Sequence, residues 1–315
     1  MKKTSYAFVV GYVRALETHL LSETALNSLK QCTDIEDFSN QLQNLGYPIK
    51  TCQNLKILDK QLQSHFINIC EDIQKSCPSG APFEWLWLKN DVSNYKAVLK
   101  SVFSNNPWKN LISRPFSVDP DLMEVCVKSK KFDKMPDFFK KISIEAFEIM
   151  SKTLNSKKVE NSIDKNLYEA MLKLSKKDVF LLERTKLEIT LKNISTAFRY
   201  LKFNLNLKDL GDFLICGGYI ELDEILKATQ EGLEGLYALL EKSNLLNIFN
   251  DISKNHLLIE KLLNEKINQF GEFSRSAAFG FAPIVSYIET LRQEHIALKL
   301  IALNLLWAKK STIDS

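Results

Sequence analysis

Two polar residues, Asp91 and Asn94, lie three positions apart in the stretch 86-LWLKNDVSNYKAVLK-100. The apolar residues around them have the spacing of an amphipathic helix. Asp and Asn are poor residues for a helix interior because their short polar side chains compete for backbone hydrogen bonds. A carboxylate and an amide at this spacing could form a catalytic pair, ligate a metal ion, or hold a neighbouring segment by hydrogen bonds.

The histidines and cysteines do not support catalysis or metal binding by a local motif. None of the four histidines stands at the spacing of a zinc motif, and no CxxC pair occurs. The chain also lacks a phosphate-binding P-loop, a GxGxxG fingerprint and a GxSxG elbow. The sequence therefore predicts no metal and no cofactor. An enzyme site assembled from scattered carboxylates remains an alternative.

One tight glycine motif is present, the pair Gly217 and Gly218 in 215-ICGGYIELDEI-225. Glycine adopts the left-handed backbone conformation that closes a helix or a turn. A phosphate cradle would call for a lysine or a further glycine step, and neither follows. The pair predicts a turn.

The composition predicts an all-α fold. The 315 residues are 45% hydrophobic and 25% charged, with 10 glycines and 8 prolines, which favours helices over a turn-rich β fold. The net charge of +4 is mild and its lysines are interspersed with acidic residues, which argues against a nucleic-acid binder. The six scattered cysteines are typical of reduced thiols in a cytoplasmic protein. The longest uncharged run, residues 276–288, is too short to span a bilayer.

The helical pattern around Asp91 occurs a second time about one hundred residues later. In both copies, apolar residues recur in steps of four and three, over 88–102 and 187–201. Thr190 stands 99 residues after Asp91. The matched polar positions are Asp91 with Thr190, Asn94 with Asn193, and Lys100 with Arg199.

A third copy runs through 291-LRQEHIALKLIALNL-305, where Glu294 stands 104 residues after Thr190. Lys299 takes the place of Lys96, Ala297 stands where the asparagine would be, and His295 falls on the apolar stripe, as in a half-buried core residue. Self-similarity at a nearly fixed interval indicates repeated supersecondary units.

Prolines and irregular stretches separate these copies. Three prolines crowd residues 105–121, and the stretch 203–218 breaks the pattern again. We therefore expect three helical units, 1–105, 106–205 and 206–315, with a long last helix from Pro283 to about Trp307. Polar residues that recur at equivalent places suggest a structural role, in which they satisfy unpaired backbone groups at a neighbouring helix end.

The whole chain resembles the C subunits of the bacterial and archaeal V-type (A/V-type) ATPases, whose eukaryotic counterpart is the d subunit. The similar segments are 6-YAFVVGYVRALETHLLS-22, 42-LQNLGYP-48, the Asp-x-x-Asn helix, Asn-Ile-x-Thr-x-x-Arg at 193–199, the Gly-Gly pair and 280-GFAPIVSYIETLRQEHIALKLI-301. Thr190 and Ala297 depart from the family, which usually has Asp and Asn there. The matching residues of the first two segments are Tyr6, Arg14, Leu20, Leu21 and Tyr47.

The resemblance implies a funnel of three similar helical units around a pseudo-threefold axis. Its wide end would rest on the membrane proteolipid ring, and its socket would receive the central shaft of the ATP-hydrolysing head. The protein would then be a non-catalytic central-stalk adaptor that transmits torque for proton or sodium transport. It would be monomeric when isolated, peripheral on the cytoplasmic face of the membrane, and would bind no nucleic acid. A helical scaffold unrelated to rotary motors is the alternative.

Overall fold

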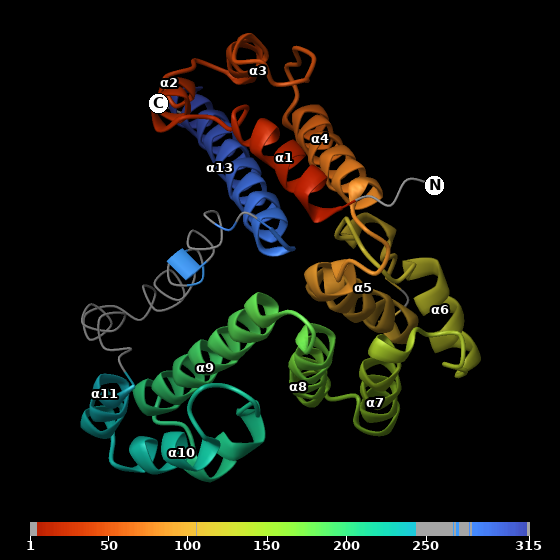
Figure 1. The fold of residues 1–315 in the computed structure, drawn as a ribbon, viewed down its shortest axis with the longest axis vertical. Coiled ribbons are helices and arrows are strands. Elements are labelled where there is room, and N and C mark those ends of the chain that lie inside the picture. The colour runs from red at the N-terminus through yellow and green to blue at the C-terminus, as the bar shows by residue number, and fades with distance from the viewer. Residues whose placement is uncertain are drawn as a thin grey trace. The chain divides into compact units, whose positions relative to one another are not determined.

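The computed structural model describes residues 5–104, 106–243, 267, 269–270, 277 and 279–313, and it describes side chains up to Trp307. The prediction of an all-α fold is confirmed for this part of the chain, which contains helices and no strand (Figure 1). The chain divides into two compact units, Met1–Ala81 with Ser274–Ser315, and Pro82–Phe273. The three-unit division remains a prediction, and residues 244–266 of the third expected unit lie outside the described residues.

Unit 1 combines segments from opposite ends of the sequence. Helix α13 packs against α4, α1 and α3. In Figure 1 the blue ribbon of α13 runs beside the red ribbon of α1. It begins one residue before Pro283, close to the expected start, and continues past Trp307 because no glycine or proline follows. The helices of unit 1 are α1 (Tyr6–Glu17), α2 (Glu23–Leu29), α3 (Ile35–Asn44), α4 (Leu55–Ser76) and α13 (Ala282–Ile313).

The core of unit 1 depends on this pairing of distant segments. Leu298 and Ala302 of α13 are fully buried in one cluster with Leu58 of α4 and Leu42 of α3. Apolar area removed from water stabilises a fold by roughly 25 cal/mol per Å². The segments before α5 therefore lack part of their core until α13 is in place.

Unit 2 is a continuous stretch of chain. Helices α7 and α8 form a hairpin, and α8 also packs against α5 on one side and α9 on another. Its elements are α5 (Phe83–Ser104), η1 (Lys109–Leu111), α6 (Pro120–Ser129), α7 (Asp137–Thr153), α8 (Ser156–Ser175), α9 (Val179–Lys202), η2 (Leu207–Phe213), α10 (Leu222–Gln230) and α11 (Leu233–Lys242).

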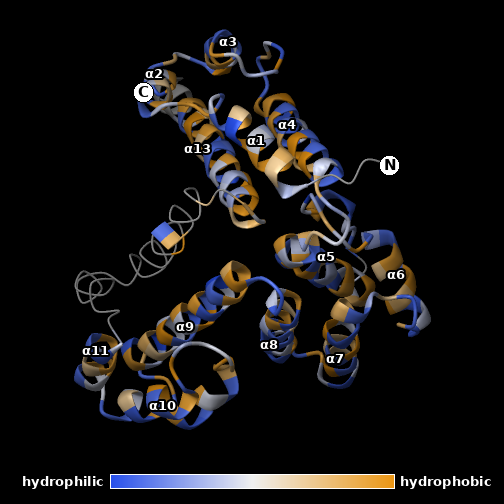
Figure 2. Cartoon of the chain, in the orientation of Figure 1, coloured by the Kyte–Doolittle hydropathy of each residue, from blue (hydrophilic) through white to orange (hydrophobic). Residues whose placement is uncertain are grey.

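Apolar faces of these helices meet in the interior of unit 2. The ring of Tyr95 on α5 meets that of Phe139 on α7 edge to face, with centroids 5.7 Å apart. Further along, Ile194 and Phe198 of α9 lie in one cluster with Leu236 of α11. Figure 2 shows the corresponding pattern, in which individual helices carry both hydrophobic and hydrophilic residues.

Polar residues fix where many helices begin. A side-chain oxygen at the N-cap accepts a hydrogen bond from the first turn and so satisfies a backbone N–H that has no partner within the helix. This occurs at Ser22, Asp34, Asn54, Asp119, Asn155, Asp178 and Asn206.

The breaks expected from the prolines are found. Helix α5 ends at Ser104, and the irregular stretch that follows contains η1 and lasts until Asp119 caps α6. Pro120 occupies the first turn of α6, where its missing N–H costs no hydrogen bond. The second break contains η2 and the turn at Gly217, before α10 begins.

We expect Leu58→Ala to destabilise unit 1 by about 2–5 kcal/mol, because it leaves a cavity in a fully buried cluster. Ile57→Ala, one residue earlier on the same helix and 51% exposed, should change stability little. Urea unfolding gives the free energies. Hydrogen exchange should also show faster exchange of α13 amides in Leu58→Ala; unchanged protection of α13 would contradict its packing on α4.

Candidate functional site

Asn94 and Asn193 make the same pair of hydrogen bonds to a loop that follows their helix. The amide of Asn94 donates to the carbonyl oxygen of Ser113 at 3.0 Å and accepts from its N–H at 2.7 Å. Asn193 does the same with Ile215, at 2.7 Å and 2.9 Å. Both asparagines are fully buried. When the loop residue is buried, its N–H and C=O lose their hydrogen bonds to water. Each carboxamide thus supplies a new acceptor for the N–H and a new donor for the C=O.

Asp91 and Thr190, three residues earlier on each helix, bind the same two loops further along. One oxygen of Asp91 accepts from the N–H groups of Ser117 and Val118, at 2.9 Å and 3.0 Å. The hydroxyl of Thr190 accepts from the N–H of Tyr219 at 2.7 Å and donates to a carbonyl of its own helix. The two loops therefore each meet their helix at two points. We call these four residues, Asp91, Asn94, Thr190 and Asn193, together with Glu294, whose contacts are described below, the clamp residues.

The Gly-Gly pair lies where the second loop touches α9. Gly217 has a φ of +94°, which only glycine adopts without strain. A Cβ on Gly218 would lie 2.7 Å from the Thr190 hydroxyl oxygen and 3.2 Å from the Thr190 backbone nitrogen. Glycine here lets the loop approach closely enough for the Thr190 bond to form.

Glu294 performs the corresponding contact within unit 1. Its two carboxylate oxygens accept hydrogen bonds from the N–H of Leu21 at 2.6 Å and from the hydroxyl of Tyr47 at 2.7 Å. Leu21 lies just before α2, as Val118 lies just before α6 and Tyr219 just before α10. Ala297 has no side chain that could form the second, amide-type contact.

Lysines at one position of the repeat pair with an aspartate of a neighbouring helix in both units. Lys96 on α5 lies 3.2 Å from Asp164 on α8, and its counterpart Lys299 on α13 lies 2.8 Å from Asp59 on α4. At the other basic position of the repeat, Lys100 pairs with Glu160 on α8 at 3.0 Å, whereas its counterpart Arg199 donates to Thr196 on its own helix at 3.4 Å. These contacts are half-exposed, so each contributes little by itself.

A buried ion cluster was not anticipated from the sequence. Glu188 on α9 is 4% exposed and pairs with Lys89 on α5 at 2.6 Å and with Arg184 at 3.1 Å. Burial would raise the pKa of Glu188, but the two cations outweigh it and hold that pKa below its ordinary value. A signal was present: Lys89 and Glu188 are 99 residues apart, so opposite charges occupy the same repeat position.

His295 lies half-buried in unit 1 beside His65, with ring centroids 5.7 Å apart. Burial, together with the charge of His65, lowers the pKa of His295 to about 4. In the part of the chain that the structure describes, no three His, Cys, Asp or Glu side chains are grouped to hold a metal ion. No helix there has the length and hydropathy needed to cross a membrane.

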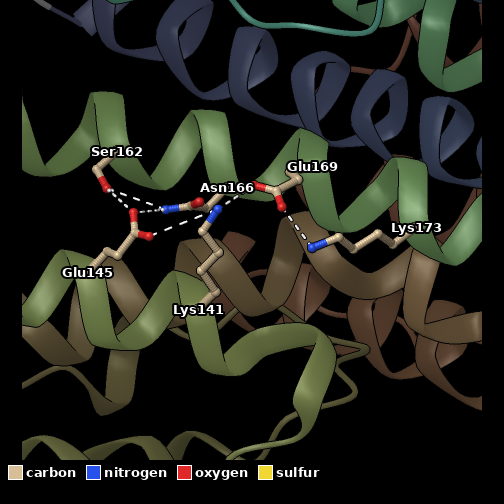
Figure 3. Close-up of polar contacts among 6 residues, drawn as sticks. All are labelled: Lys141, Glu145, Ser162, Asn166, Glu169 and Lys173. Carbon is tan, nitrogen blue, oxygen red and sulfur yellow. Dashed lines mark hydrogen bonds and ion pairs between the residues drawn. The ribbon is translucent and has the colours of Figure 1, made fainter.

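A cavity of about 1020 Å³ lies between helices α7 and α8 and the segment from η2 to Gly217. Part of its wall is a polar network, drawn in Figure 3. Asn166 donates to Glu145 at 2.7 Å, and Glu169 accepts from Lys141 and from Lys173. These hydrogen bonds lower the pKa of Glu169 and keep it ionised. No sequence motif pointed to this cavity.

Comparisons with known proteins agree with the resemblance noted in the sequence. The model of a family described as "ATP synthase (C/AC39) subunit" matches residues 9–303. Several proteins named as the C subunits of A-type ATP synthases are similar over 96% of this chain and 86% of their own length. The protein of Desulfurococcus sp. (strain SY) is 25% identical, and those of Thermococcus kodakarensis and Thermococcus onnurineus are each 23% identical.

We expect Asn193→Ala to lower the free energy of unfolding by about 1–3 kcal/mol, because the buried N–H and C=O of Ile215 both lose their partner. Lys100→Ala removes only an exposed ion pair with Glu160 and should have a small effect. Urea denaturation of both variants tests this ranking. The opposite order would show that the clamp does not hold the loop.

Asp91 should make stability depend on pH. Burial raises its pKa from 3.8 to about 7 despite the two backbone N–H bonds, and its second oxygen is buried without a hydrogen bond. The folded state thus binds the proton more tightly than the unfolded chain, so this contribution to stability is lost as the pH rises from about 4 to about 7.

The variant Asp91→Asn cannot titrate and should lose that dependence. We expect the wild type to lose more stability than Asp91→Asn between about pH 5 and about pH 8, measured as the urea midpoint. Histidine titration is common to both proteins and cancels in the comparison. Parallel pH profiles would contradict the raised pKa.

Proposed function

Because the chain belongs to the ATP synthase (C/AC39) subunit family, we propose that it is the non-catalytic central-stalk adaptor of a rotary A/V-type ATP synthase or ATPase. In this role it joins the central shaft of the ATP-hydrolysing head to the membrane proteolipid ring and transmits torque between them. The family match over residues 9–303 is the observation that carries the proposal.

The clamp residues support the three-part architecture that this role needs. Helix α5 holds the segment before α6, and helix α9 holds the segment before α10. Helix α13 in turn holds the segment before α2, through Glu294 and Leu21. In each case the last helix of one expected module binds backbone just before a helix of another module, and α13 returns in this way to the first module. We infer three modules around a pseudo-threefold axis that together form a funnel.

Stiffness is the second physical requirement for transmitting torque. In unit 2, α5 and α9 are joined by the Lys89–Glu188 ion pair and by a 2.9 Å bond from the indole N–H of Trp85 to Thr185. Asp164 of α8 binds lysines from both of these helices, Lys96 and Lys192. Such cross-links between modules limit twisting, because a buried charge deprived of its partner is costly.

The partners in this proposal are the central shaft subunits and the proteolipid ring. The protein attaches through the ring to the cytoplasmic face of the membrane, binds no nucleotide or other cofactor, and is monomeric when isolated. Membership of the family removes the alternative of a scaffold unrelated to rotary ATPases.

Deletion of the protein should uncouple ATP hydrolysis from ion transport. The head has its own nucleotide sites in this scheme, so its ATPase activity should survive, while ATP-driven ion uptake into membrane vesicles should be lost. The head should also wash off the membrane more easily. Raised ionic strength should weaken the attachment of the wild type, because charged side chains at an interface are screened by salt.

The control is the same strain carrying the wild-type gene, assayed for uptake and for retention of the head. Uptake at the wild-type level in the deletion strain, with the head still bound, would show that this chain is not the joint.

A further inference from the structure

We propose that the cavity between α7, α8 and the η2–Gly217 segment is a docking groove for an acidic, partly apolar segment of another subunit. We call it the α8 groove. Its lining includes Lys158, Lys165 and Asn166 of α8, together with Asp212 and Cys216 of the facing segment. The proposal requires only that the chain works in a complex with other subunits, so it is independent of the adaptor role.

Unpaired positive charge is concentrated on one wall of the α8 groove. Lys158 and Lys165 lie two helical turns apart on α8 and pair with no carboxylate of the described residues. Lys157 beside them lies over the ring of Phe213, at 5.1 Å. By contrast, the groove carboxylates of Glu145 and Glu169 are already engaged. This wall therefore attracts carboxylates of an incoming chain.

One member of the polar network of Figure 3, Asn166, has an unused acceptor and also lines the α8 groove. Asn166 is only 5% exposed, and its amide nitrogen donates to Glu145 and Ser162. Its carbonyl oxygen accepts no hydrogen bond from the described residues. An acceptor without a protein partner is available to water or to a ligand that supplies a donor. The backbone N–H of a docked segment is such a donor.

The dimensions and the opposite wall favour a protein segment over a small anion. The volume of about 1020 Å³ is at the upper limit of small-molecule pockets. Apolar side chains line it as well, among them Leu172, Leu214 and Leu222. Asp209 and Asp212 also line the groove, from the η2 segment, so a compact anion such as phosphate would meet negative charge beside the lysines, whereas an extended chain can keep its acidic side chains away from it. A peptide segment can instead place its acidic side chains toward the lysines of α8 and its apolar side chains against these leucines.

Zero-length carbodiimide coupling in the purified, assembled complex tests this directly. The reagent joins a carboxylate to an ammonium group with loss of water, so it links only groups in contact. We expect mass spectrometry to find Lys158 or Lys165 joined to an aspartate or glutamate of another subunit. Lys176 and Lys177, exposed residues at the far end of α8 that do not line the groove, should give no such link.

Charge reversal provides a second test with a matched control. Lys158→Glu/Lys165→Glu should lower the salt concentration at which the complex releases the contacting subunit, whereas Lys176→Glu/Lys177→Glu makes the same charge change and should behave as wild type. Neither pair of lysines forms an ion pair in the described structure, so both variants should melt as the wild type does. Equal salt sensitivity of the two variants would overturn the proposal.

Cys216 reports occupancy of the groove without any substitution. It lines the groove and is exposed, while most of the other cysteines are buried. We expect alkylation by N-ethylmaleimide to be several-fold slower in the assembled complex than in the isolated chain. Equal rates, with no cross-link to another subunit, would exclude docking here. Protection of the isolated chain by inorganic phosphate or ATP alone would identify a small-anion site and also overturn the proposal.

Discussion

A loop that packs against a helix loses its water, and its backbone N–H and C=O groups then depend on side chains of that helix. The clamp residues meet this constraint, and their chemical types follow from it. A carboxamide carries one donor and one acceptor and so matches a loop residue that offers both, as with Asn94 and Asn193. One oxygen of Asp91 accepts from two N–H groups, whereas the hydroxyl of Thr190 accepts from one. The hydroxyl of Thr190 stays neutral, whereas the Asp91 carboxyl is ionisable and burial raises its pKa to about 7.

Ion pairs add a second level of organisation, between helices that are equivalent in the repeat. Glu188 and Lys89 occupy the same repeat position in neighbouring copies and neutralise one another. Removing Glu188 would deprive both Lys89 and the buried Arg184 of this carboxylate, and breaking up a buried ion cluster costs more than the cluster itself contributes. Hydrogen bonds thus fix each loop to its helix, while charges fix the register of α5 against α9.

The sequence was most informative where local rules apply. Helical spacing and the prolines at 107–120 predicted the helical class and the break before α6. The recurrence of Asn94 as Asn193 suggested a structural role toward a neighbouring helix end. Partners of those residues could not be predicted, because Ser113 and Ile215 contribute only backbone atoms, which leave no trace in side-chain type. The α8 groove was missed for a related reason. Its lining comes from helices and a loop whose approach depends on tertiary packing and on the bare backbone of Gly218.

Unit 1 combines the two ends of the chain, and this affects how the protein folds during its synthesis. Helices α1 to α4 leave the ribosome first, whereas α13, which completes their core, follows about 200 residues after α4. At typical rates of synthesis that interval lasts about 10–40 s. During this time the apolar faces of Leu42 and Leu58 lack their partner Leu298, although unit 2 can already fold as one continuous stretch. The nascent chain therefore carries a folded middle and an unfinished beginning, and the unfinished part is where a chaperone would bind.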